Sequence, residues 1–185
     1  MTNSIADSDR ELLARAAELQ RPLRRAAAVA HANGLGLVIF GALTLCVSAL
    51  DPDVPGLLLG AVVLWAGLAE RRAALRLLAA ERRAPRDLAR NELVLLAAIA
   101  VYAVARLTVL RPSAEEWQST LEAVMTTEEA AELWDSAVDA GFGMVLVVAL
   151  AYQGSLARYF WRRQADLERF LNAVPEWARE VLRGL

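Results

Sequence analysis

Polar side chains that could form a functional site lie at one end of the long apolar runs in this sequence. Four of them come from three different runs and fall at a similar distance from the charged segments: Asn33, Glu70, Gln153 and Arg158. His31 and Glu92 lie just beyond them. One interpretation is hydrogen bonding between helices, which is worth about 0.6–2 kcal/mol per contact in a membrane. The other is a half-buried Glu70–Arg158 pair that gates a cavity open to the cytoplasm. We favour the first interpretation.

A further charged candidate, Arg106, lies about 6 Å of helix inside the opposite end of its apolar run. Ionisable groups within a membrane are costly, and they are functional candidates for that reason. A long arginine side chain can nevertheless reach the interface and pair with a carboxylate there, such as Asp139. We expect this outer ion pair. An anion-binding or gating role for Arg106 is the alternative.

Enzymatic chemistry finds little support in the sequence. The single histidine, His31, and the single cysteine, Cys46, exclude a haem held by two histidines and a disulfide-exchange pair within one chain. Neither HExxH nor Gly-x-Ser-x-Gly spacing occurs, and no glycine-rich phosphate loop is present. Carboxylates recur on one helical face between residues 128 and 139, which a solvated surface explains better than a metal site. We predict no enzymatic activity, no cofactor and no metal.

Four apolar segments must position these residues. They cover residues 32–50, 54–70, 93–110 and 141–161. A helix needs about 20 apolar residues to cross a bilayer, within a range of roughly 17–25. The second segment is short, but Arg71 and Arg72 can place their guanidinium groups at the head groups while their stems stay in hydrocarbon. We predict an all-α bundle of four transmembrane helices, accompanied by amphipathic interfacial helices.

The distribution of arginine sets the orientation of these spans. All 20 basic residues are arginines, and 18 of them fall in the segments 10–25, 71–90 and 158–183. Basic residues near spans stay in the cytoplasm. Four spans place all three segments there, whereas three spans would put the middle one outside. We therefore expect cytoplasmic N- and C-termini. The composition, rich in Ala, Leu, Val and Arg, is typical of a GC-rich bacterial genome, so the expected location is the bacterial plasma (inner) membrane.

The segments outside the predicted spans have the sequence pattern of capped helices. Residues 1–21 predict an amphipathic helix on the cytoplasmic membrane surface, with a capping box at Ser8, and Pro22 then suits the start of the next helix. Within the four-span domain, residues 22–161, a helical hairpin covers 71–92 and turns near Pro85. About thirty residues precede the first span, so we do not expect it to be cleaved as a signal peptide.

The remaining two segments follow the same pattern. The acidic outer loop, residues 111–140, predicts two short helices that begin after Ser113 and Thr126, each with a capping box. The cytoplasmic tail, residues 162–185, predicts a helix to about Asn172 and a second one from Pro175.

Small residues on the second span predict close helix packing. Gly56 and Gly60 form a GxxxG pair, and Gly67 lies on nearly the same face. Such spacing lets two backbones approach each other. An internal contact is the favoured interpretation, and a dimer interface is the alternative.

These features predict a multi-pass membrane protein that is not an enzyme. The spans are nearly free of polar groups, while the exposed segments are capped helices with apolar faces. The leading hypothesis is therefore a scaffold or accessory subunit that binds other membrane proteins, or itself, within the bilayer. The alternative is a small oligomeric channel or transporter. No nucleic-acid partner is expected, because anionic lipid and topology already account for the arginines.

Overall fold

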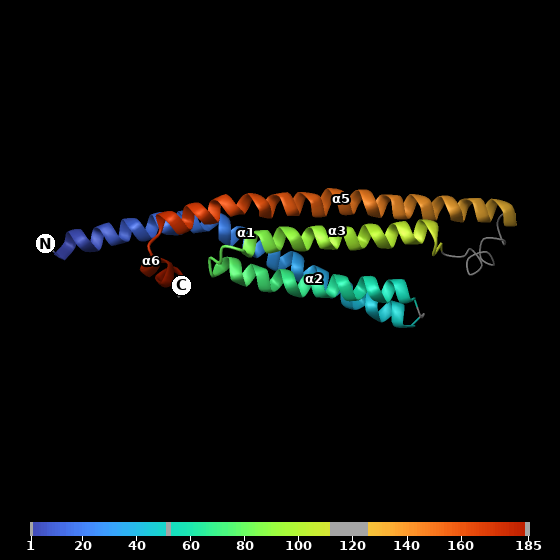
Figure 1. Ribbon diagram of the computed structural model, residues 1–185, viewed down its shortest axis with the longest axis horizontal. Helices are drawn as coiled ribbons and strands as arrows, with labels where there is room; N and C mark the ends of the chain where they lie inside the picture. The colour runs from blue at the N-terminus through green and yellow to red at the C-terminus, as the bar shows by residue number, and fades with distance from the viewer. Residues whose placement is uncertain (1, 51–52, 112–125, 184–185) are drawn as a thin grey trace.

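The computed structural model describes residues 2–50, 53–111 and 126–183, and its regular elements are helices (Figure 1). They are α1 (Thr2–Leu50), α2 (Val54–Leu78), α3 (Ala84–Thr108), α5 (Thr127–Ala173) and α6 (Glu176–Arg183). All but α6 are long and apolar enough to cross a membrane. The prediction of an all-helical chain with four candidate spans is confirmed.

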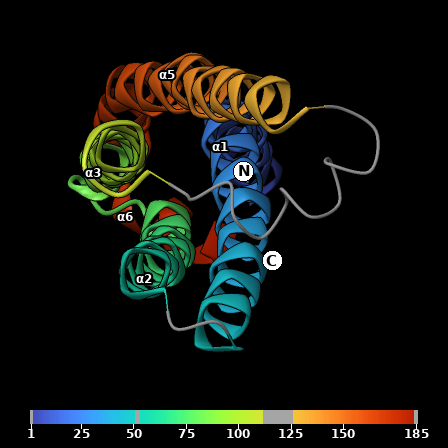
Figure 2. The same cartoon turned by 90° about the vertical axis from the view of Figure 1, so that its right-hand side faces the viewer.

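The four long helices surround a common axis, as the end-on view shows (Figure 2). α1 packs mainly along α2, and α3 packs mainly along α5. The α2–α3 hairpin is the shorter unit. α1 and α5 continue past its turn, where α6 folds back beside α1 (Figure 1). The molecule therefore has four helices that are long and apolar enough to cross a membrane, whose bundle we call the membrane part, and a second helical layer at the end that carries both termini.

The two parts differ in how they bury apolar side chains. The larger core belongs to the layer near the termini, where Leu23, Leu77, Phe160 and Phe170 are almost fully buried. In the membrane part the outward side chains are apolar and exposed, as at Val101 with 70% of its surface accessible. Apolar exposure on this scale is costly in water. It fits a helical surface that faces lipid.

The N-terminal segment departs from the predicted interfacial helix. Residues 1–21 were expected to form a separate helix before Pro22, but α1 runs from Thr2 to Leu50 with Pro22 inside it. An interior proline removes one backbone hydrogen bond and costs about 3 kcal/mol. Burial of the flanking Ala16, Leu23 and Ala26 offsets that cost, because all three lie in the larger core. The segment extends as a stalk beside α5 (Figure 1).

The turn of the hairpin lies at the predicted place and has an unusual residue in it. α2 ends at Leu78, and Pro85 lies in the first turn of α3. Backbone hydrogen bonds from Ala80 to Leu77 and from Glu81 to Arg76 form a Schellman cap. Ala80 takes φ 58°, a conformation that glycine adopts without strain and alanine does not.

The remaining outer and C-terminal elements also follow the sequence. The capping box at Thr126 and Glu129 is present, and the helix that it starts continues as α5 through the fourth span. α5 ends at Ala173 and α6 begins at Glu176, as the two tail helices were predicted. The first predicted outer helix, after Ser113, lies outside the described residues.

Candidate functional site

A cluster of four polar side chains joins all four long helices, and we call it the inner cluster: Asn33 of α1, Glu70 of α2, Glu92 of α3 and Tyr152 of α5. Asn33 Nδ2 donates to Glu70 Oε1 and Oε2 at 3.0 and 2.8 Å, and to Glu92 Oε1 at 3.3 Å. Tyr152 Oη donates to Asn33 Oδ1 at 2.9 Å. One amide thus holds two carboxyl groups and one phenol.

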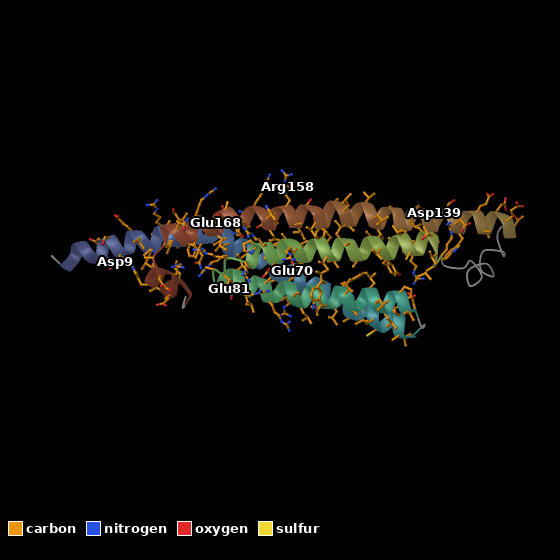
Figure 3. All side chains as sticks on the ribbon, viewed as in Figure 1. Asp9, Glu70, Glu81, Asp139, Arg158 and Glu168 are labelled. Carbon is orange, nitrogen blue, oxygen red and sulfur yellow. The ribbon has the colours of Figure 1, made fainter. Side chains whose placement is uncertain are left out.

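The two carboxyl groups of the inner cluster are fully enclosed. Glu70 and Glu92 both have 0% of their surface accessible, and Figure 3 shows Glu70 between the helices. Both accept hydrogen bonds from the same Asn33 amide, so the two carboxyl groups lie close together. Glu92 Oε2 has no hydrogen-bond partner among the residues that the structure describes. Within the described residues, neither group forms an ion pair with an arginine or with His31.

The predicted polar cluster is thereby corrected in part. Asn33 and Glu70 do meet, but Arg158 is exposed on the outward face of α5 and points away from the bundle (Figure 3). A helix turns 100° per residue, so Arg158 cannot share a face with Tyr152, six residues earlier. No Glu70–Arg158 pair forms. Gln153 is buried, and its Oε1 has no hydrogen-bond partner in the described part of the chain.

Glu92 and Tyr152 are the members of the inner cluster that sequence reasoning left out. Glu92 had been placed just beyond the cluster, at the start of the third span. The hairpin could have predicted that Glu92 lies beside Glu70, because both residues are equally far in sequence from Glu81 in the turn. Antiparallel helices bring such residues to one level. Tyr152 carried no comparable signal, because a tyrosine in an apolar run is usually an interfacial anchor.

An apolar cavity of about 710 Å³ lies between the four long helices on the side of the inner cluster away from the termini. Its walls come from every one of them, for example Leu37 of α1, Val63 of α2, Ile99 of α3 and Val145 of α5. At one end it is bounded by Tyr152 and by Gln153. The volume falls in the range of about 300–1,000 Å³ that is common for small-molecule sites.

The other end of the cavity is bounded by Tyr102 and Phe142, whose rings meet edge to face at 6.1 Å. Tyr102 belongs to a second polar group, which we call the outer cluster: Asp53, Tyr102 and Arg106. Arg106 Nε donates to Tyr102 Oη at 3.2 Å, its guanidinium lies 5.3 Å from the Tyr102 ring centroid, and it also forms an ion pair with Asp53. The outer cluster ties the start of α2 to the end of α3.

The expected Arg106–Asp139 ion pair is corrected by this arrangement. Asp53 precedes α2 and lies beside the end of α3, whereas Asp139 is on α5 and pairs with Arg111 at 3.1 Å. Arg111 also reaches Asp135 at 3.1 Å. The carboxylates of α5 therefore bind the arginine that follows α3. Among the described residues, no group of three or more His, Cys, Asp or Glu side chains could hold a metal ion.

The predicted glycines of α2 make an internal contact with α1. A Cβ placed on Gly67 would lie 2.7 Å from the carbonyl oxygen of Gly34, and one on Gly60 would lie 3.0 Å from the backbone nitrogen of Leu45. A Cβ on Gly56 would instead meet the side chains of Ser48 and Asp53. α1 contributes Gly34 and Gly41 to this seam, which sequence reasoning did not single out. The close approach brings Asn33 within reach of Glu70.

Comparisons with family models, with curated proteins and with solved structures give no match to this chain. We therefore infer the function from the geometry of the two clusters and of the cavity between them.

Proposed function

We propose that this chain is a carrier of amphipathic cations in the bacterial plasma membrane, with both termini in the cytoplasm. The arginine distribution supports that orientation, because it places the inner cluster toward the cytoplasm and the outer cluster toward the opposite side. The observation that carries the proposal is the apolar cavity with a polar cluster at each end.

The two ends of the cavity support exchange of a cation for a proton. At the inner end, Gln153 Oε1 accepts no hydrogen bond from the described residues, and Tyr152 links the cavity to the carboxyl pair through Asn33. Two buried carboxylates without a cationic side chain need a proton or a bound cation to balance their charge. A ligand with an apolar body and a cationic head matches both the walls and this end. When the head arrives, a proton that had balanced the charge of the pair can leave.

The clusters also supply the two closures that a carrier needs. The inner cluster joins all four helices on one side, and the outer cluster joins α2 to α3 on the other. In the proposed cycle one cluster opens while the other stays closed. Each is held by hydrogen bonds and ion pairs that can break and reform without disturbing the apolar packing between them.

Transport of ethidium into liposomes tests this proposal. Ethidium is an aromatic cation small enough for the cavity, and DNA enclosed in the liposomes makes its arrival fluorescent. With an acidic interior, the purified chain should raise the initial rate several-fold over protein-free liposomes. Glu70→Gln and Glu92→Gln should remove most of that increase. Arg158→Ala is the matched control, since it deletes a charge outside the cluster and should retain transport.

Wild-type protein that is helical by circular dichroism but gives the rate of empty liposomes would contradict the carrier. So would variants of Glu70 and Glu92 that transport at the wild-type rate.

The scaffold hypothesis remains a second proposal. It depends on spans that are nearly free of polar groups, and the inner cluster weakens that support. One observation still favours it, which is the helical layer near the termini with the exposed side chains of Trp161 and Trp177. A membrane protein that co-purifies in a fixed ratio and is lost when both tryptophans become alanine would support a scaffold. No transport together with such a partner would replace the carrier with it.

A further inference from the structure

A basic groove lies between α1, α2 and α6, well away from the carrier cavity. It consists of two adjoining hollows of about 750 and 550 Å³ that share Gln20, Arg24, Ala28 and Leu182. Figure 1 shows α6 folded beside α1 at this level. The groove is therefore built where the membrane part of the molecule meets the helical layer that holds the termini.

The groove carries positive charge that the described residues do not neutralise. Its lining includes Arg21, Arg24 and Arg25 together with His31, and no carboxylate is among the described lining residues. None of these four forms an ion pair within the described part of the chain. Among the described residues, Arg24 donates one hydrogen bond, from Nη2 to the carbonyl oxygen of Leu182 at 3.3 Å, whereas a guanidinium has five N–H donors.

The same groove also has an apolar wall. Leu75 and Leu78 of α2 line it with 63% and 41% of their surfaces accessible, beside Ala28 and Ala32 of α1. Arg24 lies in the same hollow as these two leucines. The apolar wall and the guanidinium groups beside it therefore match the acyl chain and the phosphate of one lipid.

From this match we infer that the groove is a binding site for an anionic phospholipid. The phosphate of this lipid contacts Arg21, Arg24 and Arg25. The rest of the head group, which is acidic or rich in hydroxyl groups, contacts the same arginines. The start of an acyl chain lies along Leu75 and Leu78. The bound lipid would hold α6 against α1 and α2, since the groove exists only while these three elements are together. This inference does not depend on the carrier proposal.

Native mass spectrometry with defined lipids tests the site. The full-length protein in a mild detergent is mixed with phosphatidylglycerol or with phosphatidylcholine that has the same acyl chains, and the first bound lipid is quantified. We expect phosphatidylglycerol to bind at least fivefold more tightly than phosphatidylcholine. Arg24→Gln should weaken phosphatidylglycerol about fivefold, which corresponds to about 1 kcal/mol for one arginine near an anionic surface.

Two further variants separate a loss of lipid binding from a loss of structure. Ala28→Phe fills the groove but retains every charge, so it should weaken the first phosphatidylglycerol even if Arg24→Gln loosens α6. Arg158→Gln removes a charge from the outward face of α5 and should leave binding unchanged. Equal binding of both lipids, or equal loss in Arg158→Gln and Arg24→Gln, would overturn the inference. Displacement of the lipid by millimolar inorganic phosphate would also overturn it, because the site would then select free phosphate.

Discussion

The contact between α1 and α2 gives a quantitative prediction for Gly67→Ala. The added Cβ would lie 2.7 Å from the carbonyl oxygen of Gly34 and 2.8 Å from the backbone nitrogen of Val38. Ordinary contacts of a Cβ begin at 3.4 Å, so the two helices would have to move at least about 0.7 Å apart. Both neighbours are backbone atoms, which cannot rotate away. Overpacking of this kind costs about 1–3 kcal/mol.

A matched substitution on the facing helix separates packing from helix propensity. Gly36 lies on α1 and a Cβ there would meet nothing within 4 Å. Gly36→Ala should therefore stabilise the protein by about 0.5–1 kcal/mol, because alanine loses less conformational freedom than glycine in a helix. The same gain partly offsets the clash at Gly67, so the net loss there is about 1–2 kcal/mol. We expect the two variants to differ by about 2–3 kcal/mol.

The free energy of unfolding in mixed micelles, followed by far-UV circular dichroism as the denaturing detergent increases, measures this difference. Gly67→Ala should unfold at a lower fraction of denaturing detergent than the wild type, and Gly36→Ala at a higher one. If both variants shifted in the same direction by the same amount, α1 and α2 would not be packed through Gly34 and Gly67. The connection between Asn33 and Glu70 would then lose its structural basis.

Three other substitutions follow from local geometry. Ala80→Gly should raise the unfolding free energy by about 0.5–1 kcal/mol in the same assay, because Ala80 has φ 58°; a decrease would mean that its partly buried methyl group matters more than its backbone. Asn33→Leu should destabilise the protein by about 1–3 kcal/mol, since it leaves two buried carboxyl groups without their shared donor, whereas Tyr152→Phe removes one hydrogen bond and should cost about 0.6 kcal/mol. Equal losses in these two would argue against Asn33 as the centre of the cluster. Thr126→Ala should speed backbone hydrogen exchange in the first turn of α5 by several-fold, because an N-cap contributes about 1 kcal/mol, and unchanged exchange would show that the cap is not used.

The sequence was sufficient for the four long helices, the hairpin turn and the capping box at Thr126, because each depends on local signals. The predicted capping box at Ser8 is wrong, since Ser8 lies inside α1, and the one at Ser113 lies outside the described residues. Runs without charge marked the four long helices, Pro85 marked the hairpin, and the spacing of Thr126 and Glu129 marked the start of α5. Pro22 misled the N-terminal assignment for a physical reason. Its cost is local, but the burial of Ala16 and Leu23 that outweighs it comes from helices distant in sequence.

The candidate site was predictable only where helix geometry fixed it. The level of Asn33 and Glu70 followed from the spans and from the glycines between them. Which face of α5 turns inward did not follow, because the fourth span is apolar all round. The inward face of α5 decides whether Tyr152 or Arg158 meets Asn33. In the same way, tertiary packing at the outer end decides whether Asp53 or Asp139 meets Arg106. The cavity is a property of four helices together and has no sequence signature.

Labelling of single cysteines in intact cells tests the central claim most directly, namely that four helices cross the membrane with the hairpin in the cytoplasm. The chain has one native cysteine, so Cys46→Ala gives a background for Glu81→Cys in the hairpin turn and Glu128→Cys at the start of α5. With a membrane-impermeant maleimide, we expect Glu128→Cys to react in intact cells and Glu81→Cys to react only after the cells are permeabilised. Labelling of Glu81→Cys in intact cells, at the rate seen for Glu128→Cys, would contradict the four-span arrangement and the carrier built on it.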